Sequence, residues 1–187
     1  MKHIAIFASG NGSNAEAIIT YFKLHPQVKV ALVVTNNPDA GVIKIAHSNK
    51  IISTIISKAA LNDPEILGRL LTALNIDMIV LAGFLQLVPE YLLQRYPKNI
   101  INIHPALLPK HGGKGMYGIK VHEAVLASGD AETGITIHYV NEHYDEGEVI
   151  LQKQVAVNTA DTSETLAGKV LQLEHEWFPQ TIKKLLV

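Results

Sequence analysis

The feature that most constrains this chain is the alternation of short apolar runs with amphipathic segments through its first hundred residues. Runs such as VKVALVVT, at Val28–Thr35, are rich in β-branched residues and almost continuous in hydrophobicity. Such runs are typical of strands that are buried on both faces of a sheet. Strands that alternate with helices in this way predict an α/β fold, with a doubly wound, mostly parallel sheet flanked by helices.

The individual elements follow from the same pattern. We predict strands at His3–Ala8, Val28–Thr35, Ile52–Ile56, Met78–Ala82 and Ile100–His104. We predict helices at Asn14–Leu24 (with Asn or Ser near its N-cap), at Ala40–Asn49, at Pro64–Leu74, and after Pro89, which suits a first helical turn. Later helices are expected at Ile119–Ser128, ended by Gly129, and at Ser163–Leu186, kinked at Pro179. Thr133–Asn141 and Val149–Val157 are expected to form a partly exposed pair, which makes the C-terminal portion partly antiparallel.

Length and composition exclude several classes of protein. The 187 residues are enough for one domain with a substantial core, so we predict a single domain over residues 1–187. The net charge is −1 and basic residues form no stripe with aromatics, which argues against nucleic acid and anionic membranes as partners. There is no cysteine, and no apolar run reaches the length of a membrane span. The N-terminal apolar run is too short for a signal peptide, so a cytoplasmic location is expected.

A glycine-rich loop, Gly10–Asn14, follows the first predicted strand and opens the first predicted helix. Unpaired N–H groups at a helix N-terminus attract anions. A dinucleotide site would need an acidic residue about twenty positions later, but the second strand ends in Thr35-Asn36-Asn37. The loop also lacks the lysine of a nucleoside-triphosphate loop. We therefore interpret it as a site for a small phosphate, held by Gly12, Ser13 and Asn14. The alternative is a tight turn without a ligand.

The stretch Asn102-Ile103-His104-Pro105 ends the last predicted parallel strand. The period of two along a strand places Asn102 and His104 on the same face. An asparagine amide can donate to a developing oxyanion, and a histidine can move protons near neutral pH. The competing interpretation is a structural asparagine beside an incidental histidine, and spacing alone does not decide between the two.

Asp145 is a third candidate, although an acid two residues before a turn glycine, here Gly147, is most often only a turn residue. Other chemistries have less support. The pairs His122-Glu123 and His175-Glu176 are not completed to H-E-x-x-H, and G-x-S-x-G is absent. We therefore predict neither a metal site nor a serine nucleophile.

Five segments, taken in order, resemble the folate-dependent formyltransferases: FASGNGSN, LAGFLQLVP, NIHPALLPK, Asp145-Glu146-Gly147 and Leu173-Glu174-His175. The NIHPALLP motif with a downstream acidic turn is specific to that superfamily. The GNGSN loop is similar to that of its phosphoribosylglycinamide formyltransferase branch. The resemblance extends over essentially the whole chain. It implies a Rossmann-like formyltransferase fold, in which residues 1–100 are the phosphate-binding half and residues 101–187 the catalytic and folate-binding half.

The resemblance also implies a reaction. The formyl group would pass from 10-formyltetrahydrofolate to the amine of 5-phosphoribosylglycinamide, giving N-formylglycinamide ribonucleotide and tetrahydrofolate in purine biosynthesis. Asn102 would stabilise the oxyanion of the tetrahedral intermediate, and His104 would assist as a cation or proton donor. Asp145 would hold His104 or an ordered water and accept the proton of the amine.

The same resemblance assigns the binding residues. The substrate phosphate would lie at Gly12, Ser13 and Asn14, and the ribose hydroxyls at Glu174. The folate would be held by Leu85, Gln86, Leu87, Val88, Asn102, Asn141, Glu142, His143, Tyr144 and Asp145. The expected partners are therefore two small molecules, with no metal, and the chain is expected to be a monomer or a homodimer.

Two departures from the family concern the glutamate tail of the folate. Some members carry arginine where this chain has Pro64 and Gln86. The loop Gly112–Gly118 is also longer than in the best-known bacterial members. Lys110 or Lys114 could take the place of those arginines, and the loop could close over substrate.

Three other functions compete with formyl transfer to a ribonucleotide. A formyltetrahydrofolate hydrolase would use water in place of the amine, but usually has an additional N-terminal regulatory domain. A methionyl-tRNA formyltransferase would need a C-terminal RNA-binding domain and a basic surface. A non-catalytic module that binds a phosphate ligand would make Asn102, His104 and Asp145 incidental.

Overall fold

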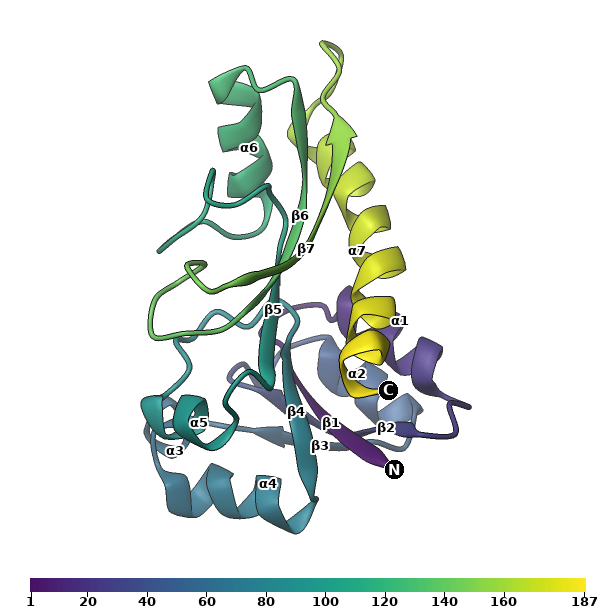
Figure 1. Cartoon of the computed structure of the whole chain (residues 1–187), viewed down its shortest axis with the longest axis vertical. Coiled ribbons are helices and arrows are strands. Elements are labelled where there is room, and N and C mark those ends of the chain that lie inside the picture. The colour runs from purple at the N-terminus through teal and green to yellow at the C-terminus, as the bar shows by residue number, and fades with distance from the viewer.

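The computed structural model describes all residues from Met1 to Val187, and its centre is one seven-stranded sheet (Figure 1). The strands are β1 (Lys2–Phe7), β2 (Val28–Thr35), β3 (Ile52–Ile55), β4 (Ile76–Leu81), β5 (Ile100–His104), β6 (Glu132–Tyr139) and β7 (Val149–Ala156). Their order across the sheet is β3-β2-β1-β4-β5-β6-β7. The first five are parallel, whereas β6 pairs antiparallel with both β5 and β7. The predicted fold class, mostly parallel with an antiparallel C-terminal portion, is confirmed.

Helices cover the sheet. They are α1 (Ser13–Phe22), α2 (Val42–Ser48), α3 (Lys58–Leu61), the π-helix η1 (Pro64–Gly68), α4 (Arg69–Ala73), α5 (Glu90–Arg95), α6 (Ile119–Ser128) and α7 (Ser163–Leu186). In Figure 1, α1, α2 and α7 lie on one side of the parallel strands, and α3, α4 and α5 lie on the other. The chain therefore changes face as it passes from β1 and β2 to β4, which is the doubly wound arrangement that the strand–helix alternation predicts.

Two apolar layers hold this sandwich together, one on each face of the sheet. Alternate residues of β1 belong to different layers: Ile4 and Ile6 face α1 and α7, whereas Ala5 and Phe7 face η1 and α4. All four are fully buried. This explains why the parallel strands are apolar at nearly every position, since both of their faces pack against helices.

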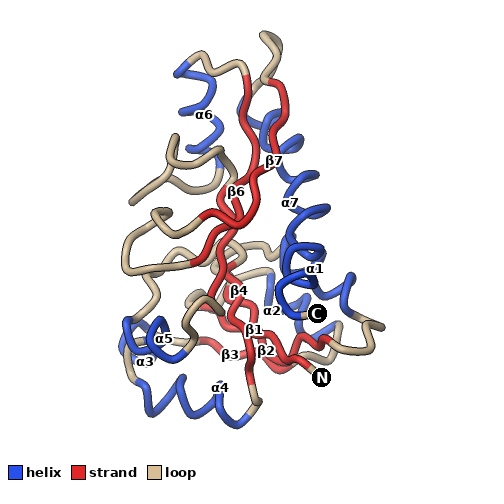
Figure 2. The backbone as a smooth tube through the Cα atoms, viewed as in Figure 1, coloured by secondary structure: helices blue, strands red, loops and turns tan.

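The β6–β7 hairpin extends beyond the parallel strands, and α6 and α7 lie beside it (Figure 2). One face of β6 is covered by α7, which packs Val170, Phe178 and Ile182 into the same layer as Ile135 and Ile137 of β6. No helix of the structure combines the length and the hydrophobicity that a membrane crossing requires.

Most predicted element positions agree with the structure, and β2, β5, α6 and α7 have the predicted bounds. The helix predicted at Pro64–Leu74 is present as two consecutive segments, the π-helical η1 and the α-helical α4, and ends at Ala73. The short helix α3 has no counterpart among the predicted elements.

Three smaller predictions concerned helix ends and a kink. The N-cap of α1 is Gly12, in the left-handed region at φ 84°, and no side chain caps that helix. Pro89 precedes the first turn of α5 as its N-cap. Pro179 lies within α7, which is continuous from Ser163 to Leu186.

Candidate active site

A large cleft lies at the carboxyl ends of the parallel strands, beside the point where the strand order changes direction between β1 and β4. Its volume is about 880 Å³. Doubly wound sheets bind their ligands at this position, because the loops after adjacent strands diverge there and leave a crevice. The lining residues come from segments 9–14, 81–88, 102–105, 113–122, 138–145 and 167–174.

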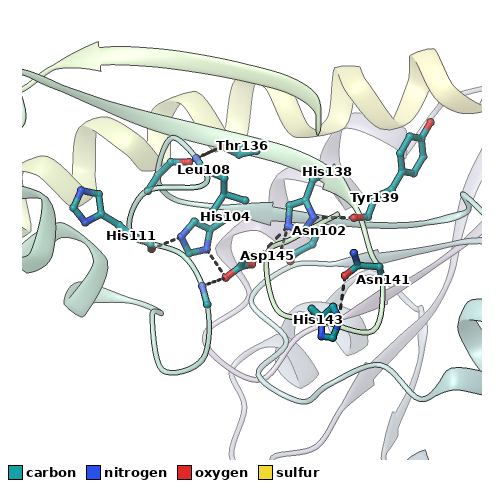
Figure 3. Close-up of polar contacts among 12 residues, drawn as sticks. Asn102, His104, Leu108, His111, Thr136, His138, Tyr139, Asn141, His143 and Asp145 are labelled. Carbon is teal, nitrogen blue, oxygen red and sulfur yellow. Dashed lines mark hydrogen bonds and ion pairs between the residues drawn. The ribbon is translucent and has the colours of Figure 1, made fainter. Parts of the chain in front are cut away.

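Strand pairing places four polar residues on the floor of this cleft or next to it. In the antiparallel pair of β5 and β6, Asn102 is opposite His138 and His104 is opposite Thr136. Residues two apart on a strand, and residues directly opposite across a pair, point to the same side of the sheet. Figure 3 shows that the side chains of Asn102, His104 and His138 gather around Asp145.

Asp145 reaches this group from the loop between β6 and β7. Its backbone has a positive φ of 60°, which turns the side chain inward and is uncommon for a residue other than glycine. Its Oδ2 accepts a hydrogen bond from the N–H of Gly113 at 2.9 Å and lies 3.5 Å from Nδ1 of His104. Its Oδ1 lies 3.4 Å from Nδ2 of Asn102 and 3.6 Å from Nε2 of His138.

The contacts of His104 identify the nitrogen that carries hydrogen. Nε2 lies 2.8 Å from the carbonyl oxygen of His111, and because a carbonyl only accepts, Nε2 is the donor. Nδ1 therefore faces Asp145, at a distance longer than an ordinary hydrogen bond. Both nitrogens are directed at protein groups, so the imidazole and Asp145 act as one unit that can take up or release a proton.

His138 orients Asn102 in the same way. The Nδ1 atom of His138 lies 2.8 Å from the carbonyl oxygen of Tyr139, so Nδ1 is its donor. The unprotonated Nε2 then accepts from Nδ2 of Asn102, 3.1 Å away. This bond identifies the Asn102 nitrogen as the atom that faces the cluster, and it makes the amide a donor there.

Burial and charge oppose each other in this cluster. Burial lowers the pKa of His104, and the nearby Asp145 carboxylate and His111 carbonyl offset this only in part. Burial also acts to raise the pKa of Asp145, but the neighbouring His138 and His104 side chains and the hydrogen bond from the Gly113 N–H outweigh it. The pKa of Asp145 is therefore below its usual value, and the carboxylate is charged near neutral pH.

At one end of the cleft, Asn14 of α1 meets Glu174 of α7, although the two residues are 160 positions apart. The Asn14 Nδ2 atom donates to Glu174 Oε2 at 2.9 Å, whereas its Oδ1 is buried without a partner. Burial raises the pKa of Glu174 to about 7. A buried acid and an unpaired amide oxygen on a cavity wall are suited to a hydroxyl-bearing ligand, which can both donate and accept.

The glycine loop surrounds the same end of the cleft. Gly10, Asn11 and Asn14 line the cavity, but Gly12 and Ser13, which we predicted as phosphate residues, do not. A Cβ atom on Gly12 would lie 2.8 Å from Cβ of Val42, so packing on α2 already requires glycine there. The N–H groups of Gly12, Ser13 and Asn14 nevertheless have no partner within the protein.

The predicted folate segments also line the cleft. Leu85, Gln86, Leu87, Val88, Asn141, His143 and Tyr144 all line it. Glu142, which we also predicted for the folate, does not line the cleft, and its side chain is exposed. The N–H groups of Gln86, Leu87 and Val88 make no hydrogen bond within the protein. Exposed apolar side chains beside unpaired backbone groups suit a flat, polar-edged ring.

The two lysines considered for the folate tail lie differently. Lys110 is turned away from the cleft and forms an ion pair with Asp130 at 2.7 Å. Lys114 lines the cleft and has no acidic partner. Gln86 also lines it, whereas Pro64 begins η1 and does not. Of the two candidates, only Lys114 is placed to meet a ligand in the cleft.

Sequence reasoning missed three residues of the site. His138 contacts both Asn102 and Asp145, and the alternation ITIHYV would have placed it beside Asn102 if the strand pairing had been known. Ser9 joins the two strand-end loops, accepting from the Leu85 N–H at 3.0 Å. His122 lines the cleft from α6, and its Nδ1 is buried without a partner. No group of three or more His, Cys, Asp or Glu side chains is arranged to bind a metal ion.

Comparison with known proteins decides the family. The family described as formyl transferase matches residues 2–182. The chain belongs to the formyl transferase family. The solved structure of a phosphoribosylglycinamide formyltransferase from Bacillus halodurans superposes on this formyl transferase with a TM-score of 0.88 at 38% identity, covering 99% of this chain and 95% of that one.

Curated relatives of the chain bear the same name as that solved structure. The phosphoribosylglycinamide formyltransferase of Bacillus subtilis is 40% identical, over 100% of this chain and 95% of that protein. The chloroplastic enzyme of Arabidopsis thaliana is 43% identical, over 97% of this chain. The chain spans 64% of the length of the Arabidopsis relative and 61% of that of a second plant relative, from Vigna unguiculata.

Proposed function

We propose that this formyl transferase transfers the formyl group of 10-formyltetrahydrofolate to the amine of 5-phosphoribosylglycinamide. The products are N-formylglycinamide ribonucleotide and tetrahydrofolate, in purine biosynthesis. The observation that carries the proposal is the cluster of Asn102, His104 and Asp145, which lines the same cleft as the glycine loop at Gly10–Asn14 and the apolar loop at Leu85–Val88. Relatives that cover nearly all of this chain bear the name of that activity.

The cluster has the groups that formyl transfer to an amine requires. The bound 10-formyl folate would supply the electrophilic carbon. Asn102 presents its amide nitrogen toward the reacting position and stabilises negative charge that develops on the formyl oxygen. Donors of this kind contribute on the order of 3 kcal/mol to lowering a barrier. Asp145, charged and paired with His104, accepts the proton that the amine must lose.

The substrate would lie at the α1 end of the cleft. The unpaired N–H groups of Gly12, Ser13 and Asn14 would bind its phosphate at the positive end of the α1 dipole. Glu174 and the unpaired Oδ1 of Asn14 would bind the ribose hydroxyls. The amine would then extend toward Asn102 along the cleft floor.

The folate would lie at the other end. The backbone of Leu85–Val88 and the segment Asn141–Asp145 would hold its pterin ring. Lys114 would meet the glutamate tail in place of the arginines that other members carry. The residues present therefore fit the co-substrate, and the hypothesis that Lys110 binds the tail is not retained, since Asp130 already pairs with it.

The phosphate-binding and catalytic halves proposed for residues 1–100 and 101–187 share this cleft, because Asn14 belongs to the first and Glu174 to the second. We also propose that the protein acts in the cytoplasm, as a monomer or homodimer.

One assay distinguishes the candidate functions. The protein is mixed with 10-formyltetrahydrofolate, with and without phosphoribosylglycinamide, while folate absorbance is followed. Turnover only in the presence of the amine substrate is expected. Turnover without that substrate would instead identify a hydrolase, and absence of turnover in both mixtures would favour a non-catalytic binding module.

A further inference from the structure

The ring of His104 is hydrogen-bonded to the main chain of a neighbouring loop. Its Nε2 donates to the carbonyl oxygen of His111 at 2.8 Å, and this bond directs Nδ1 toward Asp145 (Figure 3). The orientation of His104 therefore depends on where the His111 carbonyl lies. His111 is itself in the left-handed region, at φ 54°, a conformation that costs free energy for a residue with a Cβ atom.

The side chain of His111 fixes this conformation. Its Nε2 lies 2.8 Å from Oδ2 of Asp130, and the other carboxylate oxygen of Asp130 accepts from Lys110 at 2.7 Å. Only 15% of the His111 side chain and 19% of the Asp130 side chain are exposed, so the pair is largely shielded from solvent. Hydrogen bonds from His111 and Lys110 hold the pKa of Asp130 below its usual value.

Asp130 is anchored in turn by the end of α6. It directly follows Gly129, the C-cap of that helix, which has a left-handed φ of 71°. The contact between Asp130 and His111 therefore ties the loop after β5 to the turn between α6 and β6.

We propose that Asp130 and His111 are positioning residues, which hold the His104 ring through the His111 carbonyl so that its Nδ1 meets Asp145. The inference rests on the proposed function, because it assigns these two residues a part in formyl transfer. Neither residue lines the cleft, so both act through His104 and neither touches substrate.

Burial lowers the pKa of His104. Three titratable groups also act on it: Asp145 raises this pKa, whereas the His138 and His111 rings lower it, and the hydrogen bond to the His111 carbonyl raises it. His122, on α6, is a further neighbour. Loss of the His111 carbonyl bond removes one of the two contributions that favour the protonated ring. The titration of His104 is therefore expected to move to lower pH when His111 is released.

The test compares Asp130→Ala and His111→Gly with Asp77→Ala as a matched control. Asp77 also accepts two hydrogen bonds, from Lys2 and from the His3 N–H, both at 2.8 Å, but at the other end of the sheet. Glycine at position 111 adopts the left-handed backbone without strain, so that variant keeps the fold and loses only the anchor. Asp130→Asn, which keeps an oxygen acceptor for His111, serves as the conservative variant.

Two measurements are made on each folded variant. The first is kcat and KM for formyl transfer. The second is the NMR titration of the His104 ring, which needs no substrate. We expect Asp130→Ala and His111→Gly to lower kcat by about 10- to 100-fold, as small displacements of catalytic groups do, with KM nearly unchanged. In Asp130→Ala, which leaves the His111 ring in place, the His104 titration should shift to lower pH; in His111→Gly the loss of that ring, which itself lowers the pKa of His104, should make the downward shift smaller. Asp130→Asn should lie between Asp130→Ala and the wild type, and Asp77→Ala should match the wild type in both measurements.

The proposal is overturned if His104 titrates as in the wild type in Asp130→Ala, or if kcat is that of the wild type in both Asp130→Ala and His111→Gly. It is equally overturned if Asp77→Ala shifts the His104 titration as much as Asp130→Ala does. Should the wild-type protein not transfer formyl groups, the proposed function fails, while the titration still decides whether Asp130 and His111 orient His104.

Discussion

Asn102 donates to protein groups even before any ligand is considered. Its Nδ2 lies 3.1 Å from Nε2 of His138 and 3.4 Å from Oδ1 of Asp145. The second contact is long for a hydrogen bond, so it costs little to give up. An incoming formyl oxygen can therefore take one amide hydrogen while His138 keeps the other. The pairing with His138 prevents the amide from rotating away in the meantime.

Removal of this donor should affect turnover more than binding. We expect Asn102→Ala to lower kcat by about 10²- to 10³-fold, because the donor acts on charge that develops in the transition state. Asp145→Asn should cause a comparable loss, since an amide cannot accept the proton of the amine. Steady-state kinetics together with equilibrium binding of the ribonucleotide measure the two effects separately. Wild-type turnover in either variant would remove that residue from the mechanism.

Glu174 should make stability depend on pH. Its pKa is raised by burial from 4.5 to about 7, so its contribution is complete below 4.5 and is lost as the pH rises through 7. Glu174→Gln, which cannot ionise, should exceed the wild type in free energy of unfolding by on the order of 2 kcal/mol at pH 8 and by little at pH 4.5.

Urea unfolding at both pH values measures this difference. The matched control is Glu16→Gln, which makes the same chemical change at an exposed position of α1. That control should stay close to the wild type at both pH values. If the difference in free energy of unfolding between Glu174→Gln and the wild type does not grow with pH, Glu174 is not held in its neutral form.

The residues of the site differ in how far sequence reasoning could find them. Asn102 and His104 share a strand, so their common face follows from the period of that strand alone. Asp145 and His138 depend on the pairing of β6 with β5 and on a positive φ at position 145, neither of which a local pattern contains. The sequence alone made Asp145 a weak candidate beside a turn glycine, the family resemblance strengthened it, and nothing indicated His138.

Among the elements, β6 supports the loop that follows β5. The Thr136 hydroxyl, fully buried, donates to the Ala106 carbonyl at 2.7 Å and accepts from the Leu108 N–H at 3.0 Å. The Gln152 side chain also donates to it, at 2.9 Å. Strand and loop are thus joined by one hydroxyl, directly beneath the segment that leads to His111.

Two threonines of β6 provide a matched comparison. Thr136→Val should reduce the free energy of unfolding by about 1–3 kcal/mol, because it leaves buried polar groups without a partner. Thr133→Val should be neutral or stabilising, since the Thr133 hydroxyl is buried and has no partner to lose. Chemical denaturation of both variants measures the difference. Equal losses would mean that the hydroxyl of Thr136 does not support the loop.

Lys114 belongs to the glycine-rich loop Gly112–Gly118. Lys114 lines the cleft without an acidic partner, so Lys114→Ala should weaken the apparent affinity for a polyglutamylated folate and leave that for a monoglutamate folate nearly unchanged. Lys120→Ala, on α6, is a control for the loss of one positive charge. KM measured with both folates gives the answer, and an unchanged KM for the polyglutamate would exclude Lys114 as the tail contact.

Element positions were predictable where a regular apolar pattern runs through the element. The strands β2 and β5 and the helices α6 and α7 have the predicted bounds. The four-residue helix α3 has only Ser57 as its N-cap signal, which is too little to distinguish a turn of helix from a loop. The π-helical bonding of η1 has no counterpart in the spacing of apolar residues, which is similar for one turn of either helix.

At the scale of the whole molecule, the buried histidines and Glu174 change the free energy of unfolding in opposite directions as the pH falls. Burial lowers the pKa of His104 and His122, so both are neutral in the fold and gain protons more readily when it opens. A lowered folded pKa means that this stability is present above about 6.5 and is lost as the pH falls below it. The same fall in pH strengthens the contribution of Glu174, so the two trends partly cancel.

A substitution at Glu174 removes its contribution to the pH dependence and leaves that of the histidines. In Glu174→Gln the free energy of unfolding should fall between pH 7.5 and pH 5.5, because only the histidines then titrate. Adding His122→Gln should make that fall smaller. Equilibrium unfolding in urea at several pH values measures both slopes, and identical slopes in the single and double variants would contradict a neutral, buried His122.

The hydrogen bond between Asn14 and Glu174 joins residues 160 positions apart. In the order of synthesis, the glycine loop leaves the ribosome long before α7 does. A growing chain can therefore form its parallel strands while one wall of the cleft does not yet exist. The nascent chain has no complete cleft at this end until translation passes position 174, so a ligand that needs both Asn14 and Glu174 cannot bind while most of the fold is still being assembled.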